Sequence, residues 1–127
     1  MAKTHTQPAI QPRVKLWIAA DDESVFCSGL HQILKAVEST GSIKAAAAQV
    51  DRSYRFIWAR IKRAEVACGS TLVTTSVGGT GSRRSELTPL AHELLTTFDE
   101  FRAELHQLVD TRFAPRIDGL LRKHSQD

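Results

Sequence analysis

The sequence predicts a mainly helical domain that carries one small β-hairpin. Apolar residues recur at helical spacing in several separate stretches, and a run rich in β-branched residues leads into a cluster of glycines. The chain has 127 residues, of which 42% are hydrophobic, and this length and composition are typical of one globular domain.

The N-terminal third of the chain predicts a tail, a strand and a helix. Residues 1–13 hold two prolines and few apolar side chains, so we expect a flexible tail. Period-two alternation over residues 14–18 predicts a short strand that ends before Asp21. A helix is then expected from about Ser24 to Thr40, with Gly41 as its terminator and an apolar stripe at Leu30, Ile33, Leu34 and Val37.

Two further helices are predicted, each beginning at a serine. Ser42 is expected to cap a helix of barely two turns, and Ser53 to cap the next helix. In this third helix the spacing predicts a buried face formed by Tyr54, Ile57, Trp58 and Ile61. Trp58 is also a candidate for stacking on nucleic-acid bases, although its spacing favours a place in the core.

A hairpin and a long helix are expected to complete the chain. Residues 72–77 are predicted to pair with residues 86–88 across a basic, glycine-rich tip. Thr88 then caps a helix with Pro89 in its first turn, which stops before Pro115 and is followed by a short closing helix. The apolar residues of this helix follow a 3.5-residue period and form a seam of Leu94, Phe98, Phe101, Leu105 and Leu108. Such a seam predicts a homodimer. The alternative is that the helix packs only on its own domain.

Positive charge is concentrated in the middle of the sequence. Between Ser42 and Glu86 there are eight basic and three acidic residues, a net charge of +5, whereas the rest of the chain carries −2. A basic centre in a slightly acidic frame is typical of proteins that bind polyanions. The alternative is a solvated basic surface without a partner.

Two short helices, the second basic on its outer face, followed by a basic hairpin predict a winged helix-turn-helix. Its boundaries are expected at residues 14–88, after the tail at 1–13 and before the helices at 89–127. In such a domain the second helix enters the major groove of DNA and the hairpin reaches the backbone or the minor groove. The residues expected to contact DNA are Ser42, Arg52, Ser53, Tyr54, Arg55, Phe56, Ala59, Arg60 and Arg63, with Gly79, Thr80, Gly81, Ser82, Arg83 and Arg84 in the wing.

The motifs also resemble a known family. The sequence Ser-Tyr-x-x-x-Trp from Ser53 to Trp58, the Gly-Gly-x-Gly of residues 78–81 and Leu-Thr-Pro at residues 87–89 are similar to the DNA-binding domain of the ModE family of molybdate-responsive transcription regulators. A weaker likeness to LysR-type domains covers residues 34–95. The resemblance implies that Ser53, Tyr54, Arg55 and Trp58 lie on the recognition helix.

This sequence also departs from the ModE pattern. Arg52 stands where an apolar residue is usual, and Ser-Arg-Arg-Ser at residues 82–85 replaces further glycine. Only about 17 residues follow the long helix, too few for an oxyanion-binding module. We therefore expect no small-molecule ligand and no cofactor.

Other classes of function find little support in the sequence. The glycine cluster lacks the lysine of a phosphate-binding loop, and the five histidines and two cysteines are scattered without metal-ligand spacing. No stretch approaches a membrane span or a secretory signal, which predicts a cytoplasmic protein that is neither an enzyme nor a membrane protein. We thus expect a sequence-specific regulator that binds a palindromic operator in double-stranded DNA. The alternative is a protein-interaction or nucleoid-type module that uses the same fold.

Overall fold

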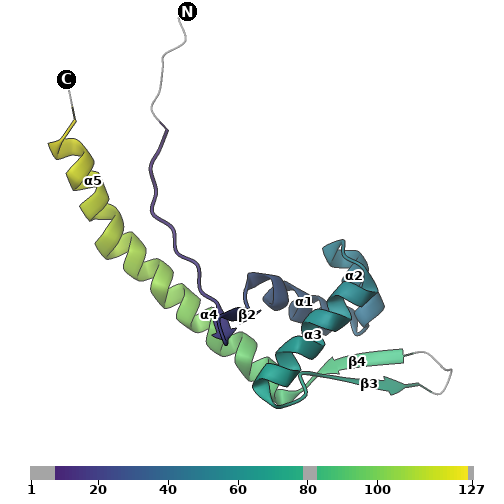
Figure 1. Cartoon of the computed structure of the whole chain (residues 1–127). Helices are drawn as coiled ribbons and strands as arrows, with labels where there is room; N and C mark the ends of the chain where they lie inside the picture. The colour runs from purple at the N-terminus through teal and green to yellow at the C-terminus, as the bar shows by residue number, and fades with distance from the viewer. Residues whose placement is uncertain (1–7, 79–82, 126–127) are drawn as a thin grey trace, which may run out of the picture. The chain divides into compact units, whose positions relative to one another are not determined.

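The computed structural model describes residues 8–78 and 83–125, which form two compact units. One unit comprises Leu16–Asp99, and the other combines the N-terminal segment up to Lys15 with the chain from Glu100 onward. The first unit contains two β-hairpins, the three helices between them and the first half of helix α4. Figure 1 shows how these elements follow one another along the chain. Helix α4 (Pro89–Leu108) runs from the first unit into the second.

A β-hairpin opens the first unit, where the sequence predicted only one strand. Strand β1 (Ile18–Ala20) pairs antiparallel with β2 (Glu23–Phe26) across a turn at Asp21 and Asp22. Both aspartates adopt positive φ angles of 50° and 68°, a conformation that aspartate tolerates better than most residues. The predicted strand ends before Asp21 as expected but begins only at Ile18. The predicted helix start near Ser24 was wrong, because the Asp-Asp turn sends residues 23–26 back as a strand.

Helix α1 ends at its predicted terminator, and the next two helices begin at their predicted serine caps. Helix α1 (Ser28–Thr40) ends at Gly41, whose φ of 73° suits glycine. Helix α2 (Ile43–Val50) begins at Ser42, whose Oγ accepts the N–H of Ala45 at 3.1 Å. Helix α3 (Tyr54–Cys68) begins at Ser53, whose Oγ accepts the N–H of Phe56 at 3.1 Å. Both predicted serine caps are thus confirmed.

One hydrophobic core lies between these helices and the start of α4. Leu30, Leu34 and Val37 of α1 are fully buried, and complete burial of such side chains contributes about 1.5–3 kcal/mol each. From α3 the core receives Ile57, Ile61 and Ala64. Tyr54 and Trp58 are 44% and 46% exposed, so their predicted place in the buried face was wrong. The small Ala64 continues the stripe because a residue three positions after Ile61 lies on the same face of a helix.

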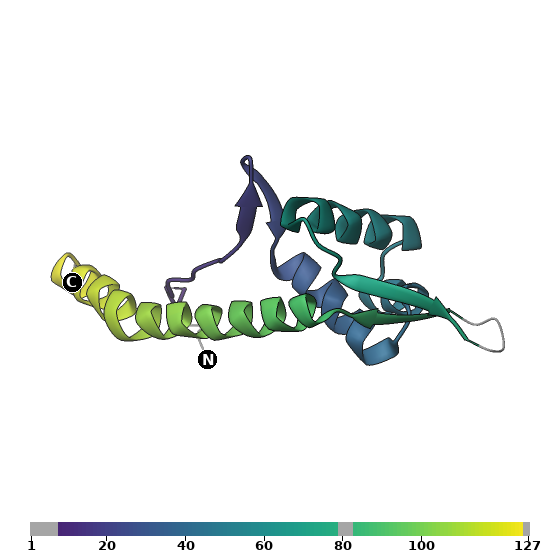
Figure 2. The ribbon, with the colours of Figure 1, turned by 90° about the horizontal axis from the view of Figure 1, so that it is seen from below.

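The second hairpin is the wing of a winged helix-turn-helix. Strands β3 (Val73–Val77) and β4 (Arg83–Leu87) pair antiparallel, with Val73 opposite Leu87 and Val77 opposite Arg83. Figure 2 shows the two strands extending side by side past the start of α3. Strand β4 begins earlier than predicted, so Arg83 and Arg84 belong to a strand and not to the tip.

Hydrogen bonds at two places fix this wing to the helices. The Glu65 carboxylate accepts the N–H groups of Leu72 and Val73 at 2.8 and 3.1 Å. On the other strand, the N–H of Ser85 donates to the carbonyl of Gly41 at 2.8 Å. The wing is therefore held at the end of α3 and at the turn between α1 and α2.

The long C-terminal helix begins as predicted, but the residues of its apolar seam are shared between the two units. The Thr88 hydroxyl accepts the N–H of Ala91 at 3.3 Å, which confirms the predicted cap. Phe98 is only 4% exposed and belongs to the core of its own unit, and Leu94 packs against that core. In the second unit Phe101 and Leu108 are 49% and 48% exposed. Only Phe101, Leu105 and Leu108 of the seam therefore lie outside the first unit.

The chain stays helical beyond α4. A five-residue π-helix (Val109–Phe113) leads into α5 (Ala114–Lys123), the expected closing helix, which includes Pro115 in its first turn. The π-helix lies just before this proline, and such wider turns occur as local irregularities within α-helices. No helix in the described part of the chain is long and apolar enough to cross a membrane.

Candidate DNA interface

Helix α3 presents two of its basic residues, Arg55 and Lys62, on the side opposite the core. Because Ile57, Ile61 and Ala64 face inward, the 100° turn per residue directs Arg55, Ala59 and Lys62 outward. All three are exposed. Arg55 forms no ion pair among the described residues, so its guanidinium is available to a ligand.

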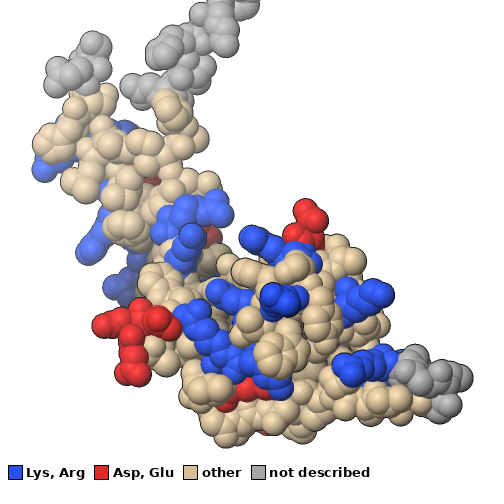
Figure 3. All heavy atoms as spheres, turned by 45° about the vertical axis from the view of Figure 1, so that its right-hand side comes forward, with Lys and Arg blue, Asp and Glu red and all other residues tan. Residues whose placement is uncertain are grey.

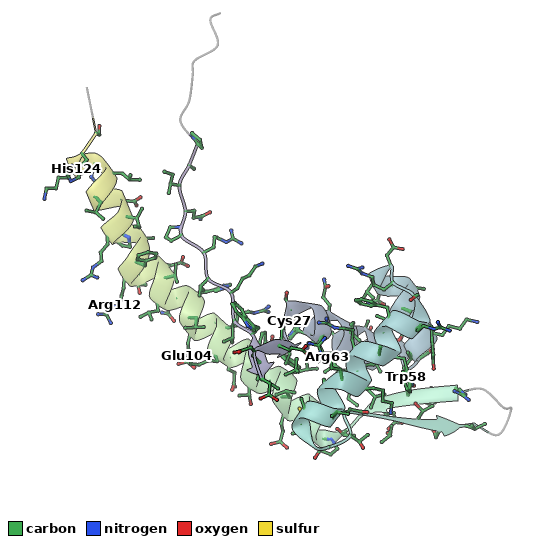
Figure 4. All side chains as sticks on the ribbon, viewed as in Figure 1. Cys27, Trp58, Arg63, Glu104, Arg112 and His124 are labelled. Atoms are coloured by element: carbon green, nitrogen blue, oxygen red, sulfur yellow. The ribbon has the colours of Figure 1, made fainter. Side chains whose placement is uncertain are left out.

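The flank of α3 next to the wing carries two exposed aromatic residues. Figure 4 shows Trp58 on this side of the helix. The Nζ of Lys62 lies 5.5 Å from the centre of the Trp58 ring and 3.2 Å from Glu65 Oε1. Tyr54 lies one turn before Trp58 on the same flank. The resemblance had placed Tyr54 and Trp58 on the recognition helix, whereas helical periodicity had assigned both to its buried face.

A hollow of about 500 Å³ lies between the start of α2, the start of α3 and the wing. Two cations line it, Lys44 from α2 and Arg83 from β4, together with the ring of Tyr54. The remaining lining residues are Ser42, Ile43, Thr75 and Ser85. Lys44 was not among the predicted contacts. Its place in the first turn of α2, next to the cap, is the signal that could have identified it.

On the opposite flank of α3, three predicted DNA contacts are already engaged within the protein. The Arg52 and Arg60 guanidinium carbons lie 5.0 and 5.9 Å from the centre of the Phe56 ring. Arg60 Nη2 also lies 3.4 Å from Cys27 Sγ. These contacts hold Arg60 against the start of α1, so it does not project freely as the sequence had predicted.

Arg63 is held in a similar way by strand β2. Its Nη2 donates to the carbonyl of Ser24 at 3.1 Å and lies 3.1 Å from Glu23 Oε1. Figure 4 shows Arg63 on the side of α3 toward Cys27. Helical spacing alone predicted that Arg63 faces a DNA groove, and the β1–β2 hairpin adds a partner that this spacing did not reveal.

The basic residues of the wing continue this surface. Arg83 and Arg84 are exposed on β4, and the Arg84 guanidinium lies beside the Gly41 backbone, 4.0 Å from where a Cβ would stand. The predicted contacts Gly79, Thr80, Gly81 and Ser82 lie outside the described residues. Figure 3 shows Lys and Arg side chains gathered over the face that carries α3 and the wing. This face has the charge and the helix presentation that duplex DNA requires.

The sequence of this region matches a known family. Residues 30–92 match the bacterial regulatory helix-turn-helix proteins of the lysR family, from the first full turn of α1 to the first turn of α4. This segment is a LysR-family helix-turn-helix domain. The family and the fold are those of DNA-binding transcription regulators, and the predicted winged helix-turn-helix fold is confirmed.

Two curated relatives confirm the resemblance to ModE-type proteins. The LysR-family domain and its flanks are 35% identical over 98 residues to "Molybdenum transport protein ModE" of Herbaspirillum seropedicae, covering 73% of this chain and 36% of the relative. They are 29% identical over 79 residues to "Molybdenum-pterin-binding protein MopB" of Rhodobacter capsulatus, covering 62% and 29%. The chain spans about a third of the length of these relatives.

Among solved structures, the LysR-family domain is similar to the chain described as "Crystal structure of CbnR_DBD-DNA complex". The TM-score is 0.47 and the sequence identity 23%, and the similarity covers 77% of this chain and 97% of that one.

Proposed function

We propose that this chain is a sequence-specific regulator of transcription that binds double-stranded DNA and has no catalytic activity. The observation that carries the proposal is the exposed basic face of α3 beside a hollow lined by Lys44 and Arg83. An α-helix fits the major groove, where an arginine can donate two hydrogen bonds to guanine. We assign Arg55 to base contact, and Lys44 and Arg83 to the DNA backbone.

We further propose that the chain acts in the cytoplasm as a homodimer on a palindromic operator. Exposed apolar side chains in the second unit support a dimer: Phe101 and Leu108 from the predicted seam, and Phe113, Leu120 and Leu121 beyond it. A dimer presents two copies of α3, which reach half-sites about one helical turn of DNA apart, ~34 Å. The same apolar residues favour a second candidate function, a module that binds another protein.

Selection of bound fragments from genomic DNA, followed by fluorescence anisotropy on the selected duplex, tests the proposed function. We expect binding to the selected duplex to survive an excess of unrelated DNA, and Arg55→Ala to weaken it by about 1–3 kcal/mol, the contribution of one bidentate base contact. Arg122→Ala in α5 is the matched control, because it removes an exposed arginine far along the chain from α3.

Two outcomes would contradict the proposal. Equal affinity of the wild-type protein for every duplex would indicate a nucleoid-type protein. Unchanged duplex binding by Arg55→Ala would remove α3 from the interface and favour the protein-interaction module.

A further inference from the structure

The exposed arginine at the far end of the basic face, Arg63, already has an acidic partner. Its Nη2 meets both the carbonyl of Ser24 and the Oε1 of Glu23, at 3.1 Å each. The Arg63 side chain is 44% exposed and that of Glu23 is 72% exposed. The ion pair thus lies at the surface, where a ligand from solution can reach both groups.

A DNA phosphate offers arginine the same chemistry as the Glu23 carboxylate. Both present two oxygens that share a negative charge, and the planar fork of a guanidinium can bind either group through two parallel donors. Glu23 also projects its charge next to α3, so it repels a phosphate that approaches Arg63. The Glu23 carboxylate therefore opposes a contact between Arg63 and a DNA phosphate.

We propose that Glu23 competes with the DNA backbone for Arg63 and thereby limits the affinity of this chain for duplex DNA. The inference rests on the proposed function. It makes the β1–β2 hairpin a part of the interface, through Glu23 in strand β2. The carbonyl of Ser24 remains in place when Glu23 is replaced, so Arg63 keeps one of its two acceptors.

Glu23→Gln tests the competition with little effect on the fold, because an exposed ion pair contributes little to stability. We expect affinity for the selected duplex to rise about two- to five-fold, the range of one exposed ion pair. If Arg63 gains one phosphate, the plot of log affinity against log salt steepens by about 0.9. Arg63→Gln should abolish both effects, so the double variant should equal Arg63→Gln alone.

Asp22→Asn is the matched control. Asp22 is an exposed carboxylate next to Glu23, has no ion pair among the described residues, and has a φ of 68° that asparagine also adopts. We expect its affinity to stay within about 1.5-fold of wild type because salt screens exposed charges that have no close partner. Circular dichroism and thermal unfolding verify that all variants are folded.

Three outcomes would overturn the inference. Equal gains from Glu23→Gln and Asp22→Asn would indicate a general charge effect, and a gain that persists without Arg63 would exclude competition. Weaker binding by Glu23→Gln would show that Glu23 orients Arg63 for DNA. If the wild-type protein binds no duplex, the proposed function and this inference both fail. If the wild-type protein binds and Arg55→Ala weakens the binding, the proposed function stands, and the result for Glu23→Gln tests only this inference.

Discussion

His31 Nε2 lies 2.6 Å from Asp99 Oδ1, so that a histidine of α1 and an aspartate of α4 form a partly buried pair. The imidazole also packs 5.7 Å from the ring of Phe98. Two turns earlier on α4, His92 Nδ1 lies 3.1 Å from Glu38 Oε2 of α1. These pairs join α4 to the helix-turn-helix beside the apolar contact of Phe98 with Phe26, whose ring centres lie 4.9 Å apart.

Replacing one carboxylate of these pairs should loosen the junction between α1 and α4. We expect Asp99→Asn to lower the free energy of unfolding by about 0.5–1.5 kcal/mol, the contribution of one hydrogen bond. Urea denaturation at pH 7 measures this change. Glu93→Gln, an exposed carboxylate on the same helix, should leave stability unchanged; an equal loss in both variants would mean that the pair contributes nothing specific.

Glu65 should make the free energy of unfolding depend on pH. Burial raises the pKa of its carboxyl, but the N–H groups of Leu72 and Val73 and the nearby Lys62 outweigh this effect and hold the pKa below its ordinary value of 4.5. The stabilisation is therefore fully present above pH 4.5 and is lost as the pH falls through the lower pKa of the folded state.

Glu65→Gln tests this acid dependence. We expect the variant to unfold more easily than wild type at pH 7, by about 1–3 kcal/mol for a carboxylate bound by N–H donors. The difference between the two proteins should shrink as the pH falls below 4.5 and through the lower pKa of the folded state, because the wild-type carboxyl is then becoming protonated. A difference that stays constant from pH 7 to pH 3 would contradict the assigned role.

Cys27 should be more reactive toward alkylating reagents than an ordinary cysteine near neutral pH. Burial raises the pKa of its thiol, but a larger opposite effect comes from the N–H groups of Leu30 and Gly29, the Ser24 hydroxyl and the charge of Arg60. The net pKa therefore lies below the ordinary 9.0. Because the pKa is lower, a larger fraction of the thiol is ionised at pH 8, and the thiolate is the form that reacts. Alkylation rates across pH 6–10, measured by mass spectrometry in a Cys68→Ser background, check this prediction. Arg60→Ala should shift the profile to higher pH, and an unshifted profile would count against the Arg60 contact.

The two cations of the hollow should contribute affinity without specificity. We expect Lys44→Ala and Arg83→Ala each to weaken binding to all duplexes by a similar factor. Each should also reduce the slope of log affinity against log salt by about 0.9, because each loses one phosphate contact. Anisotropy titrations at several salt concentrations test this on the selected duplex and on a scrambled one. A loss confined to the selected duplex would indicate base contact instead.

Two phenylalanines one turn apart on α4 should behave in opposite ways. Phe98→Ala should cost about 3–5 kcal/mol of stability because its ring is buried in the core. Phe101→Ala should leave stability at low protein concentration nearly unchanged and weaken the proposed dimer, as measured by sedimentation equilibrium. If Phe101→Ala leaves the association state unchanged, the seam does not form the dimer contact.

Local chemistry accounts for the parts of the fold that were predicted correctly. Ser42, Ser53 and Thr88 cap helices because a side-chain oxygen can accept an N–H two or three residues ahead, a property that depends only on nearby residues. The β-branched run at residues 73–77 favours a strand for a similar local reason. The winged helix-turn-helix therefore followed from spacing, caps and charge, and the family match agrees with it.

Contacts between segments distant in sequence account for what was missed. The partners of Arg60 and Arg63 lie 33 and 39 residues earlier in the chain. Lys44 and Arg83 line one hollow because the wing packs against the turn between α1 and α2, where Ser85 donates to Gly41. Trp58 has the spacing of a core residue, yet the core is completed by Ala64, which leaves the indole exposed beside the wing. Short-range spacing thus specified which residues lie on α3 and that its outer face is basic. The packing of the β1–β2 hairpin against one flank decided that Arg63 has partners within the protein, because an ion pair or hydrogen bond needs both partners within a few ångströms and sequence spacing does not fix that distance.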